Sequence, residues 1–388
     1  MDFKPLPFRS ALEQYQKQAK ELLEAHRSGD SQASRVMHEN HPRFLDSTIS
    51  WLPKNLSDSE IRSAGLELAD AQLTIARCYS FQSWPALAEY IEAGTRDGSP
   101  VFLFESAVEA VVTGDAATLE SLLRANPELV RARSTRITHF DPPVHRATLL
   151  HYVAANGVEG YRQKTPKNTV EIAKTLLKAG AEVDALADMY GGHYTTMSML
   201  VSSCHPAEAG VPLVETLLDF GAATEARGSA TWGSPLMTAL AFGYRSAAAA
   251  LVRRGAPVDN VAAAAGLGRL AEAAQLLATA DPESRHRALA LAAQHGHVDM
   301  VRLLLDAGED PSRYNPEGNH SHSTPLHQAI LAGHDGVVRL LVDRGARLDI
   351  KDTIYLGTPL DWAMYAGQTN IEKYLRAHGA KTAEELGL

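Results

Sequence analysis

Two histidines separated by one residue, His320 and His322, could together bind a metal ion. In an extended strand, residues i and i+2 point to the same face, so both imidazole rings could reach one ion. A complete site needs two more ligands, which His145 or His193 would have to supply from other parts of the chain. Two histidines in a Gly-Asn-Ser loop are more often polar loop residues, and we therefore predict no metal ion and no cofactor.

Two short clusters contain the residue types of a hydrolytic site: His139, Asp141 and His145, and Ser202, Ser203 and His205. A catalytic triad is defined by geometry rather than by nearness in sequence. Neither cluster contains the strained turn that makes a serine nucleophilic. The sequence has no glycine-rich phosphate loop, and Gly191-Gly192 alone is a weak signal. Both clusters are better explained as loop residues, and catalysis is kept as an alternative.

The composition excludes several classes of function. The chain has 388 residues, a formal net charge of −9 and no basic run that could neutralise phosphates, so nucleic acid is not an expected partner. Its two cysteines, Cys78 and Cys204, lie far apart without metal-binding spacing, which favours a reducing compartment. No segment approaches the roughly 20 apolar residues of a membrane helix, and no signal peptide is visible. We therefore expect a cytoplasmic protein that does not bind membranes.

A short motif recurs along the chain and predicts its architecture. The motif opens with Thr-Pro-Leu or a close variant, has an alanine five or six residues later and a glycine nine residues later. Its copies begin at Thr148, Ser234, Thr324 and Thr358, with a looser copy at Thr196. Proline is tolerated in the first turn of a helix, so each opening predicts a helix start. The offset from Thr324 to Thr358 is 34 residues.

A second marker closes each repeat: an apolar helix, then Gly-Ala, then in most copies an aspartate, as in Val301–Gly308, Val337–Asp349, Ile172–Asp184, Val214–Ala222 and Ala248–Asp259. Glycine at these helix ends suits the left-handed C-cap conformation. Over roughly residues 100–388, the two markers and their period resemble the ankyrin repeat family, whose period is about 33. The resemblance implies an all-α solenoid of stacked helix pairs with short β-hairpin fingers. In that family the fingers and the first helices line a concave groove.

The resemblance predicts two parts in the chain. Residues 97–388 would form an array of about eight helix pairs, with Phe102–Val130 and Thr358–Ala380 as the terminal caps. Residues 1–96 do not fit the repeat and predict a small helical segment or cap in front of it. Within this segment, Asp70–Trp84 looks like the helical leader that precedes ankyrin arrays in a group of bacterial proteins.

Two of the predicted helix pairs depart from the repeat. In the fifth pair, Asn260–Ala280, the connections are too short for fingers, so we expect a notch in the groove with Ala262–Ala265 as its floor. The second pair carries an insertion between Gly157 and Val170 that contains Tyr161, Arg162 and Lys164. Long insertions in compact units are often functional, and a cation beside a tyrosine could bind an acid group.

Residues just before the repeat motifs fall near the groove and are often aromatic or basic, as binding hot spots are. Together with two residues of the insertion they form the predicted binding set: His145, Arg146, Tyr161, Arg162, Tyr190, His193, Trp232, His320, His322 and Tyr355. His151 and His327 occupy the fourth position of the motif. For these two the resemblance implies a structural role, because the family uses this histidine to hydrogen-bond the backbone and to hold neighbouring hairpins.

The function that best fits these observations is a binding or scaffold protein that recognises a protein or peptide partner on the concave face. A rigid repeat surface suits such recognition because little entropy is lost on binding. The alternative is an enzyme or a small-molecule binder that uses a groove pocket lined by finger histidine, tyrosine and tryptophan residues. Ankyrin arrays rarely catalyse, so binding without catalysis is the preferred interpretation.

Overall fold

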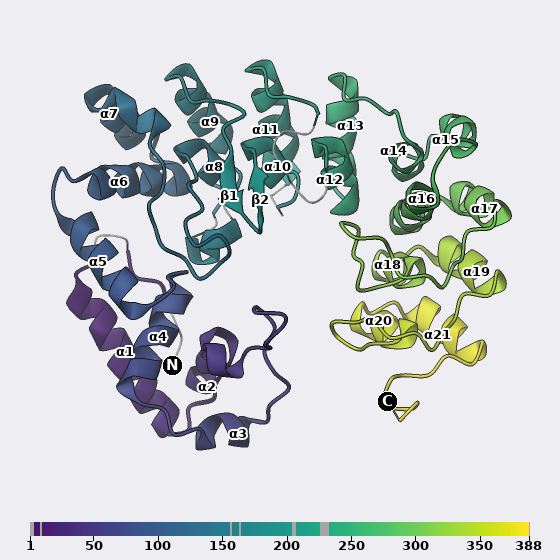
Figure 1. The fold of residues 1–388 in the computed structure, drawn as a ribbon, viewed down its shortest axis with the longest axis horizontal. Helices are drawn as coiled ribbons and strands as arrows, with labels where there is room; N and C mark the ends of the chain where they lie inside the picture. The colour runs from purple at the N-terminus through teal and green to yellow at the C-terminus, as the bar shows by residue number, and fades with distance from the viewer. Residues whose placement is uncertain are drawn as a thin grey trace. The chain divides into compact units, whose positions relative to one another are not determined.

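The computed structural model describes residues 4–7, 10–155, 157–162, 164–203, 207–225 and 233–387. The chain forms two compact units, residues 1–222 and 230–388. Helices dominate both units, and the strands in the described residues form a single two-stranded hairpin (Figure 1). The predicted all-α fold is thus confirmed. Among these residues, every helix is too short or too polar to span a bilayer.

The first unit begins with a cluster of short helices that share one hydrophobic core. These are α1 (Leu12–Arg27), α2 (Ser31–Asn40), the 3-10 helix η1 (Pro42–Phe44), α3 (Asp58–Ser63), α4 (Leu68–Cys78) and α5 (Trp84–Thr95). Leu22, Met37, Ile75 and Leu87 are almost completely buried in this core, and Tyr161 packs against it from much later in the sequence. Residues 12–95 therefore contact the repeat region through its insertion. The division of the chain at residues 96 and 97 stays a prediction.

Three helix pairs complete the first unit. They are α6 (Pro100–Thr113) with α7 (Ala116–Ala125), α8 (Leu149–Val153) with α9 (Thr169–Lys178), and α10 (Thr196–Leu200) with α11 (Ala207–Asp219). The 3-10 helix η2 (Pro127–Arg131) follows α7, and η3 (Gly157–Arg162) lies in the insertion between α8 and α9. Strands β1 (Ala187–Met189) and β2 (Gly192–Tyr194) form an antiparallel hairpin before α10. The first helices stack on one another in sequence order (Figure 1).

The second unit contains five helix pairs in its described residues. They are α12 (Pro235–Ala241) with α13 (Arg245–Arg253), α14 (Val261–Gly266) with α15 (Leu270–Leu277), α16 (Pro282–His295) with α17 (Val298–Asp306), α18 (Pro325–Leu331) with α19 (Asp335–Asp343), and α20 (Pro359–Tyr365) with α21 (Thr369–Ala377). The outer helices are amphipathic: in α19, for example, Val337, Val338 and Leu341 are buried on one face. Within this unit the first helices form one layer and the second helices another (Figure 1).

The recurring motif forms the start of each first helix. In α18 the Nδ1 atom of His327 accepts a hydrogen bond from the backbone N–H of Thr324 and lies 2.8 Å from its hydroxyl oxygen. Asp361 makes the equivalent contacts with Thr358 in α20, so a carboxylate replaces the imidazole there. His151 uses its other nitrogen, Nε2, to donate to the carbonyl of Tyr194 in the hairpin that follows. The histidines of the motif are structural, as the resemblance implied.

The fifth helix pair lacks fingers, but it does not leave an open notch. Helices α15 and α16 are joined by residues 278–281 alone, and Ala262–Ala265 are all buried. The side chains of Gln294 and His320 both donate to the carbonyl oxygen of Ala241 at 2.8 Å, and so bridge the α14 repeat. The expected small-residue floor is therefore covered, because the finger before α18 reaches back across the shortened repeat.

Candidate functional site

The β1–β2 hairpin carries two of the predicted binding residues, Tyr190 and His193. Both residues of its two-residue turn have positive φ, 50° at Tyr190 and 73° at Gly191, as in a type I′ turn. The Tyr190 side chain is 43% exposed at the tip. His193 Nδ1 lies 2.7 Å from Asp188 Oδ1 on the paired strand. The hairpin thus presents an aromatic ring, while its histidine is held by a neighbouring carboxylate.

His145 and Arg146 are neighbours in sequence but differ completely in exposure. Arg146 is exposed, whereas His145 is fully buried with its Nε2 atom 2.8 Å from Glu159 Oε1. His145 Nδ1 accepts a hydrogen bond from the backbone N–H of Ala147, so Nε2 is the nitrogen that donates to Glu159. His145 is therefore not on an exposed recognition surface. Its burial depends on Glu159, which the insertion brings to it.

His320 and His322 lie in the finger before α18 and do not converge on a shared ligand position. Their ring centroids are 6.2 Å apart in an edge-to-face arrangement. His320 Nε2 donates to the carbonyl of Ala241, and His322 Nδ1 lies 3.7 Å from the buried Asp352 carboxylate. Across the part of the chain that is described, no three His, Cys, Asp or Glu side chains are grouped as metal ligands. Trp232 lies outside the described residues.

The last three helix pairs expose an unusual number of large apolar side chains. Of the twelve that are exposed in the described residues, six lie between Tyr314 and Tyr365. Five of these form what we call the C-terminal apolar surface: Leu331, Tyr355, Leu356, Met364 and Tyr365. Leu331 and Tyr365 occupy equivalent positions, each seven residues after the motif threonine, on the neighbouring helices α18 and α20. Large apolar side chains that are exposed on neighbouring repeats are candidates for contact with a partner.

The buried side chain of Asp352 holds the finger that carries Tyr355. Its carboxylate accepts hydrogen bonds from the backbone N–H groups of Tyr355 and Gly357 and from the indole N–H of Trp362. Burial opposes ionisation, but these bonds and the contact with His322 hold the pKa of Asp352 well below its usual value. The His322 ring lies edge-to-face with Tyr355 at 6.1 Å. Tyr355 is therefore exposed on a fixed backbone.

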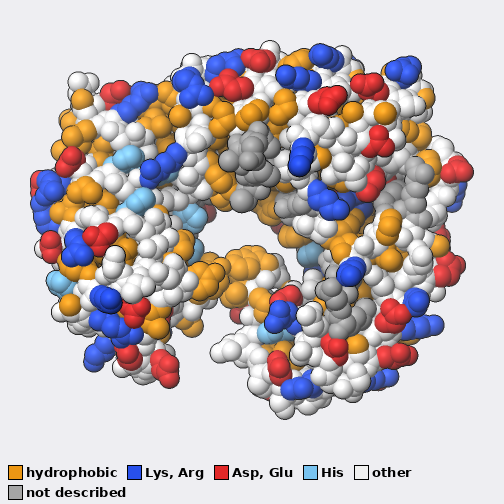
Figure 2. All heavy atoms as spheres, turned by 180° about the vertical axis from the view of Figure 1, so that it is seen from behind, with side chains coloured by type: hydrophobic (Ala, Val, Ile, Leu, Met, Phe, Trp, Pro, Cys, Tyr) orange, Lys and Arg blue, Asp and Glu red, His pale blue; other side chains and the backbone are white. Residues whose placement is uncertain are grey.

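Charged side chains of both signs are intermixed on the face drawn in Figure 2. Lysine and arginine side chains lie among aspartate and glutamate there and form no continuous basic stripe. Nucleic-acid binding needs a continuous basic surface to neutralise phosphates. The view in Figure 2 agrees with the net charge of −9 in offering none on this face.

A network of buried charges lies in the first unit, where the insertion meets the first helix pairs. Arg162 donates to both Glu105 and Glu159, with its Nη1 atom 2.5 Å from Glu105 Oε2 and its Nε atom 2.5 Å from Glu159 Oε2. Arg136 reaches the other oxygen of Glu105 at 3.3 Å, and Tyr90 donates to the same oxygen at 2.6 Å. All four charged side chains are at most 8% exposed. We call these four residues the buried charge network.

The buried charge network is balanced, because two carboxylates face two guanidinium groups. Burial alone would raise the pKa of Glu105 and Glu159, but Arg136 and Arg162 hold both pKa values below the usual range. The guanidinium of Arg136 also lies over the rings of Phe81 and Tyr90, at 4.5 and 5.0 Å from their centroids. Such packing stabilises a desolvated cation. The network thus ties the N-terminal helices, α6 and the insertion together.

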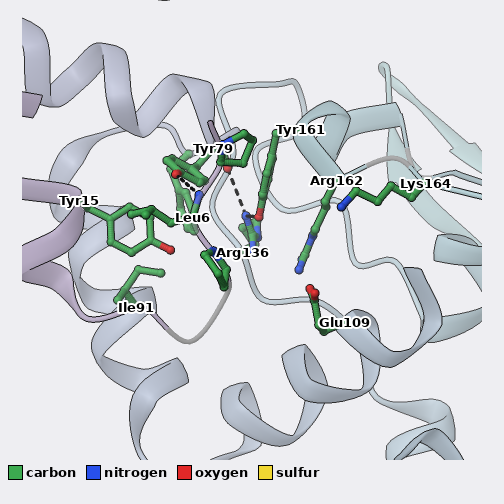
Figure 3. A pocket seen from close by; sticks show the side chains of 12 residues that line it. Leu6, Tyr15, Tyr79, Ile91, Glu109, Arg136, Tyr161, Arg162 and Lys164 are labelled. Carbon is green, nitrogen blue, oxygen red and sulfur yellow. Dashed lines mark hydrogen bonds between the residues drawn. The ribbon is translucent and has the colours of Figure 1, made fainter. Parts of the chain in front are cut away.

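A pocket of about 200 Å³ opens beside this network (Figure 3). We call it the N-terminal pocket; its lining includes Leu6, Tyr15, Phe81, Arg136, Tyr161, Arg162 and Lys164. Figure 3 shows Tyr15 and Ile91 on one side and Arg162, Lys164 and Glu109 on the other, with Arg136 between them. The insertion residues Tyr161 and Arg162, predicted to bind, thus share a cavity with residues that the sequence did not indicate. Tyr15 and Arg136 lie far from them in the chain, which leaves no local signal.

The described side chains of the two candidate catalytic clusters do not form a reactive site. His139 stacks on Phe140 with ring centroids 4.3 Å apart, and burial lowers its pKa to about 4. His145 turns to Glu159 instead of Asp141. The hydroxyl of Ser202 donates to the carbonyl of Met199, and His205 lies outside the described residues. The described side chains of these clusters therefore serve local structure.

The comparisons with known proteins agree with this geometry. The family model of ankyrin repeats in three copies matches residues 260–352 and 319–385. This chain is 36% identical over 103 residues to mouse ankyrin repeat and SAM domain-containing protein 6, a match that covers 26% of this chain and 11% of that protein. It is 32% identical over 97 residues to the NF-kappa-B inhibitor cactus of Drosophila melanogaster, which covers 25% and 19%. The chain therefore carries ankyrin repeats, which the family model matches between residues 260 and 385.

The matches span only a part of these relatives, from 11% to 19% of their lengths. Among solved structures, the ankyrin repeat domain of human ASB11 aligns with 71% of this chain and 99% of its own length, at 22% identity and a TM-score of 0.37. Ankyrin repeats in general mediate protein–protein interactions, which supports a binding role for a chain that carries them.

Proposed function

We propose that this protein binds a protein or peptide partner through the C-terminal apolar surface of its second unit. The observation that carries the proposal is the exposure of Tyr355 and Tyr365, which are 63% and 89% exposed. Exposing such rings to water does not stabilise the isolated chain. A partner that covers them, in contrast, buries a large apolar area. The fixed finger around Asp352 lowers the entropy lost on binding.

The equivalent placement of Leu331 and Tyr365 supports the same proposal. Neighbouring first helices present them side by side, so a partner segment that crosses α18 and α20 would contact both. The predicted residues His322 and Tyr355 lie in the fingers of the same two repeats. The remaining predicted residues that are exposed, Arg146, Tyr190 and His193, belong to the first unit and are proposed as contacts for the same class of partner.

Replacing both tyrosines with alanine, in Tyr355→Ala/Tyr365→Ala, should weaken partner binding about 10- to 100-fold. Two aromatic contacts of about 1–2 kcal/mol each account for this loss. The melting temperature should barely change, because both side chains are exposed. Binding is measured by quantitative mass spectrometry of proteins captured from the source cells, followed by calorimetry with the purified partner.

Phe220→Ala is the matched control, because Phe220 is an exposed aromatic residue that follows the second helix of its pair, α11. It should capture the partner as well as the wild type does. Equal capture by the wild-type protein and the double variant would refute the proposed surface.

A further inference from the structure

Two tyrosine hydroxyl groups in the N-terminal pocket have hydrogen atoms that no described residue accepts. Tyr15 is only 2% exposed, and within the described chain its hydroxyl group has no hydrogen-bond partner. The hydroxyl of Tyr161 accepts from Arg136 Nη1 at 2.8 Å, which leaves its own proton to be donated. Burial raises the pKa of both tyrosines, so both remain protonated donors. Because both residues line the pocket, a molecule in the pocket can accept hydrogen bonds from these hydroxyl groups.

The other side of the pocket is apolar and small. Leu6, Phe81 and Ile91 belong to its lining. Figure 3 shows Leu6 and Ile91 on the same side of the pocket as Tyr15. Its volume of about 200 Å³ is below the roughly 300–1,000 Å³ that drug-sized ligands occupy. An occupant that fits is therefore a compact molecule with an apolar body and a polar end that accepts hydrogen bonds.

The charges around the pocket favour one negative charge on that polar end. The guanidinium groups of Arg136 and Arg162 line the cavity, while Glu105 and Glu159, which neutralise them, are not part of the lining. The lining thus contains the cationic members of these ion pairs without their carboxylate partners. The exposed side chains of Glu109 and Lys164 also belong to the lining. Since Glu105 and Glu159 already neutralise the two arginines, Lys164 is the cation of the lining that remains for a ligand, which suits one carboxylate better than a dianion such as phosphate.

From these three observations we propose that the N-terminal pocket binds a small monocarboxylic acid with a compact apolar body. The apolar part packs between the rings of Tyr15 and Phe81. The carboxylate accepts hydrogen bonds from Tyr15 and Tyr161 and lies towards the cationic side near Lys164. This site is separate from the C-terminal apolar surface, so it does not depend on the proposed partner binding.

The probe for this proposal is sodium benzoate, added to the full-length protein. Saturation-transfer NMR follows its ring protons, and calorimetry gives its dissociation constant. Benzyl alcohol has the same ring without the charge and should bind at least about tenfold more weakly, since charged acceptors form the stronger hydrogen bonds. Inorganic phosphate at the same concentration should not displace benzoate. Displacement by phosphate, or equal binding of benzyl alcohol, would overturn the proposed ligand class.

Two variants test the location of the site. Tyr15→Phe keeps the ring in the hydrophobic core and removes one donor, so benzoate should bind about 3- to 10-fold more weakly. Lys164→Ala changes an exposed side chain outside the buried charge network and should weaken benzoate to a similar extent. Lys167→Ala, three residues further along and equally exposed, should leave binding unchanged. Absence of benzoate binding at millimolar concentration, or equal binding by all three variants, contradicts the proposal.

Discussion

Replacing Glu105 with glutamine is expected to lower the free energy of unfolding of the first unit by about 3–5 kcal/mol. Glu105 is fully buried and receives hydrogen bonds from Tyr90, Arg136 and Arg162. Glutamine keeps the size of the side chain but leaves the two guanidinium groups with a single buried carboxylate, Glu159. An uncompensated buried cation is costly, because the surrounding protein solvates it poorly. Urea denaturation followed by circular dichroism measures the change.

The same substitution one helical turn later provides the control. Glu109 lies on α6 as Glu105 does, but its side chain is exposed and outside the buried charge network. Glu109→Gln should change the free energy of unfolding by less than about 0.5 kcal/mol. If the two glutamine variants lose the same stability, the buried charge network does not stabilise the fold as we describe.

The repeat architecture could be predicted from the sequence because its signals are local. Thr324 and His327 lie within one helical turn, and the hydrogen bonds between them define the helix start wherever the motif occurs. Glycine at the end of a helix is equally local: Gly296 ends α16 with a φ of 78°. Each such signal determines the structure of a few residues without reference to the rest of the chain. The helix pairs can therefore be predicted from the sequence, whereas the contacts between repeats cannot.

The N-terminal pocket and the buried charge network depend on contacts that no local pattern encodes. Arg162 binds Glu105 across 57 positions in sequence. The sequence indicates an unusual insertion and predicts Tyr161 and Arg162 as binding residues, but it does not identify their partners. His145 was misplaced for the same reason: its position before a motif indicates a finger, whereas its carboxylate partner Glu159 comes from the insertion.

The C-terminal apolar surface was only partly predicted. Tyr355 was selected because it lies in a finger, whereas Leu331 and Tyr365 were overlooked although they occupy the same position of the motif. Both repeats have a large apolar residue seven positions after the threonine, where the motif has no buried leucine or alanine. An alignment of the repeats reveals this position as a sign of an exposed apolar surface. The hydrogen bond between His320 and the carbonyl of Ala241 cannot be predicted from the sequence. It depends on the distance between the repeats on either side of the α14 repeat.

The free energy of unfolding is expected to fall by about 2 kcal/mol in each unit when the pH drops from 6 to 5. Burial lowers the pKa of four histidines to about 4: His139 and His151 in the first unit, and His295 and His327 in the second. The unfolded chain has a histidine pKa near 6.5 and therefore binds more protons than the folded chain between these values. Stability is thus fully present above pH 6.5 and falls towards pH 4, by roughly 1.4 kcal/mol per pH unit for each histidine.

His295 shows why the folded state resists protonation. Its Nε2 atom donates to the carbonyl of Leu240 at 2.8 Å, and its Nδ1 atom accepts from Arg245 at 3.2 Å. A second proton would have to enter at Nδ1, against the guanidinium that now donates to it. The rings of His297 and His334 lie in the same group and add no negative charge that would offset the cost.

A substitution at His295 separates this effect from general acid denaturation. Glutamine can donate to the Leu240 carbonyl but does not titrate, so His295→Gln should reduce the loss of stability of the second unit between pH 6 and 5 by about 1 kcal/mol. His378→Gln, at an exposed position of the same unit, should leave the slope as in the wild type. Urea denaturation at pH 7.5, 6 and 5 gives the slopes. An unchanged slope in His295→Gln would show that other groups cause the pH dependence, because removing a group that titrates on unfolding must remove its share of the protons taken up.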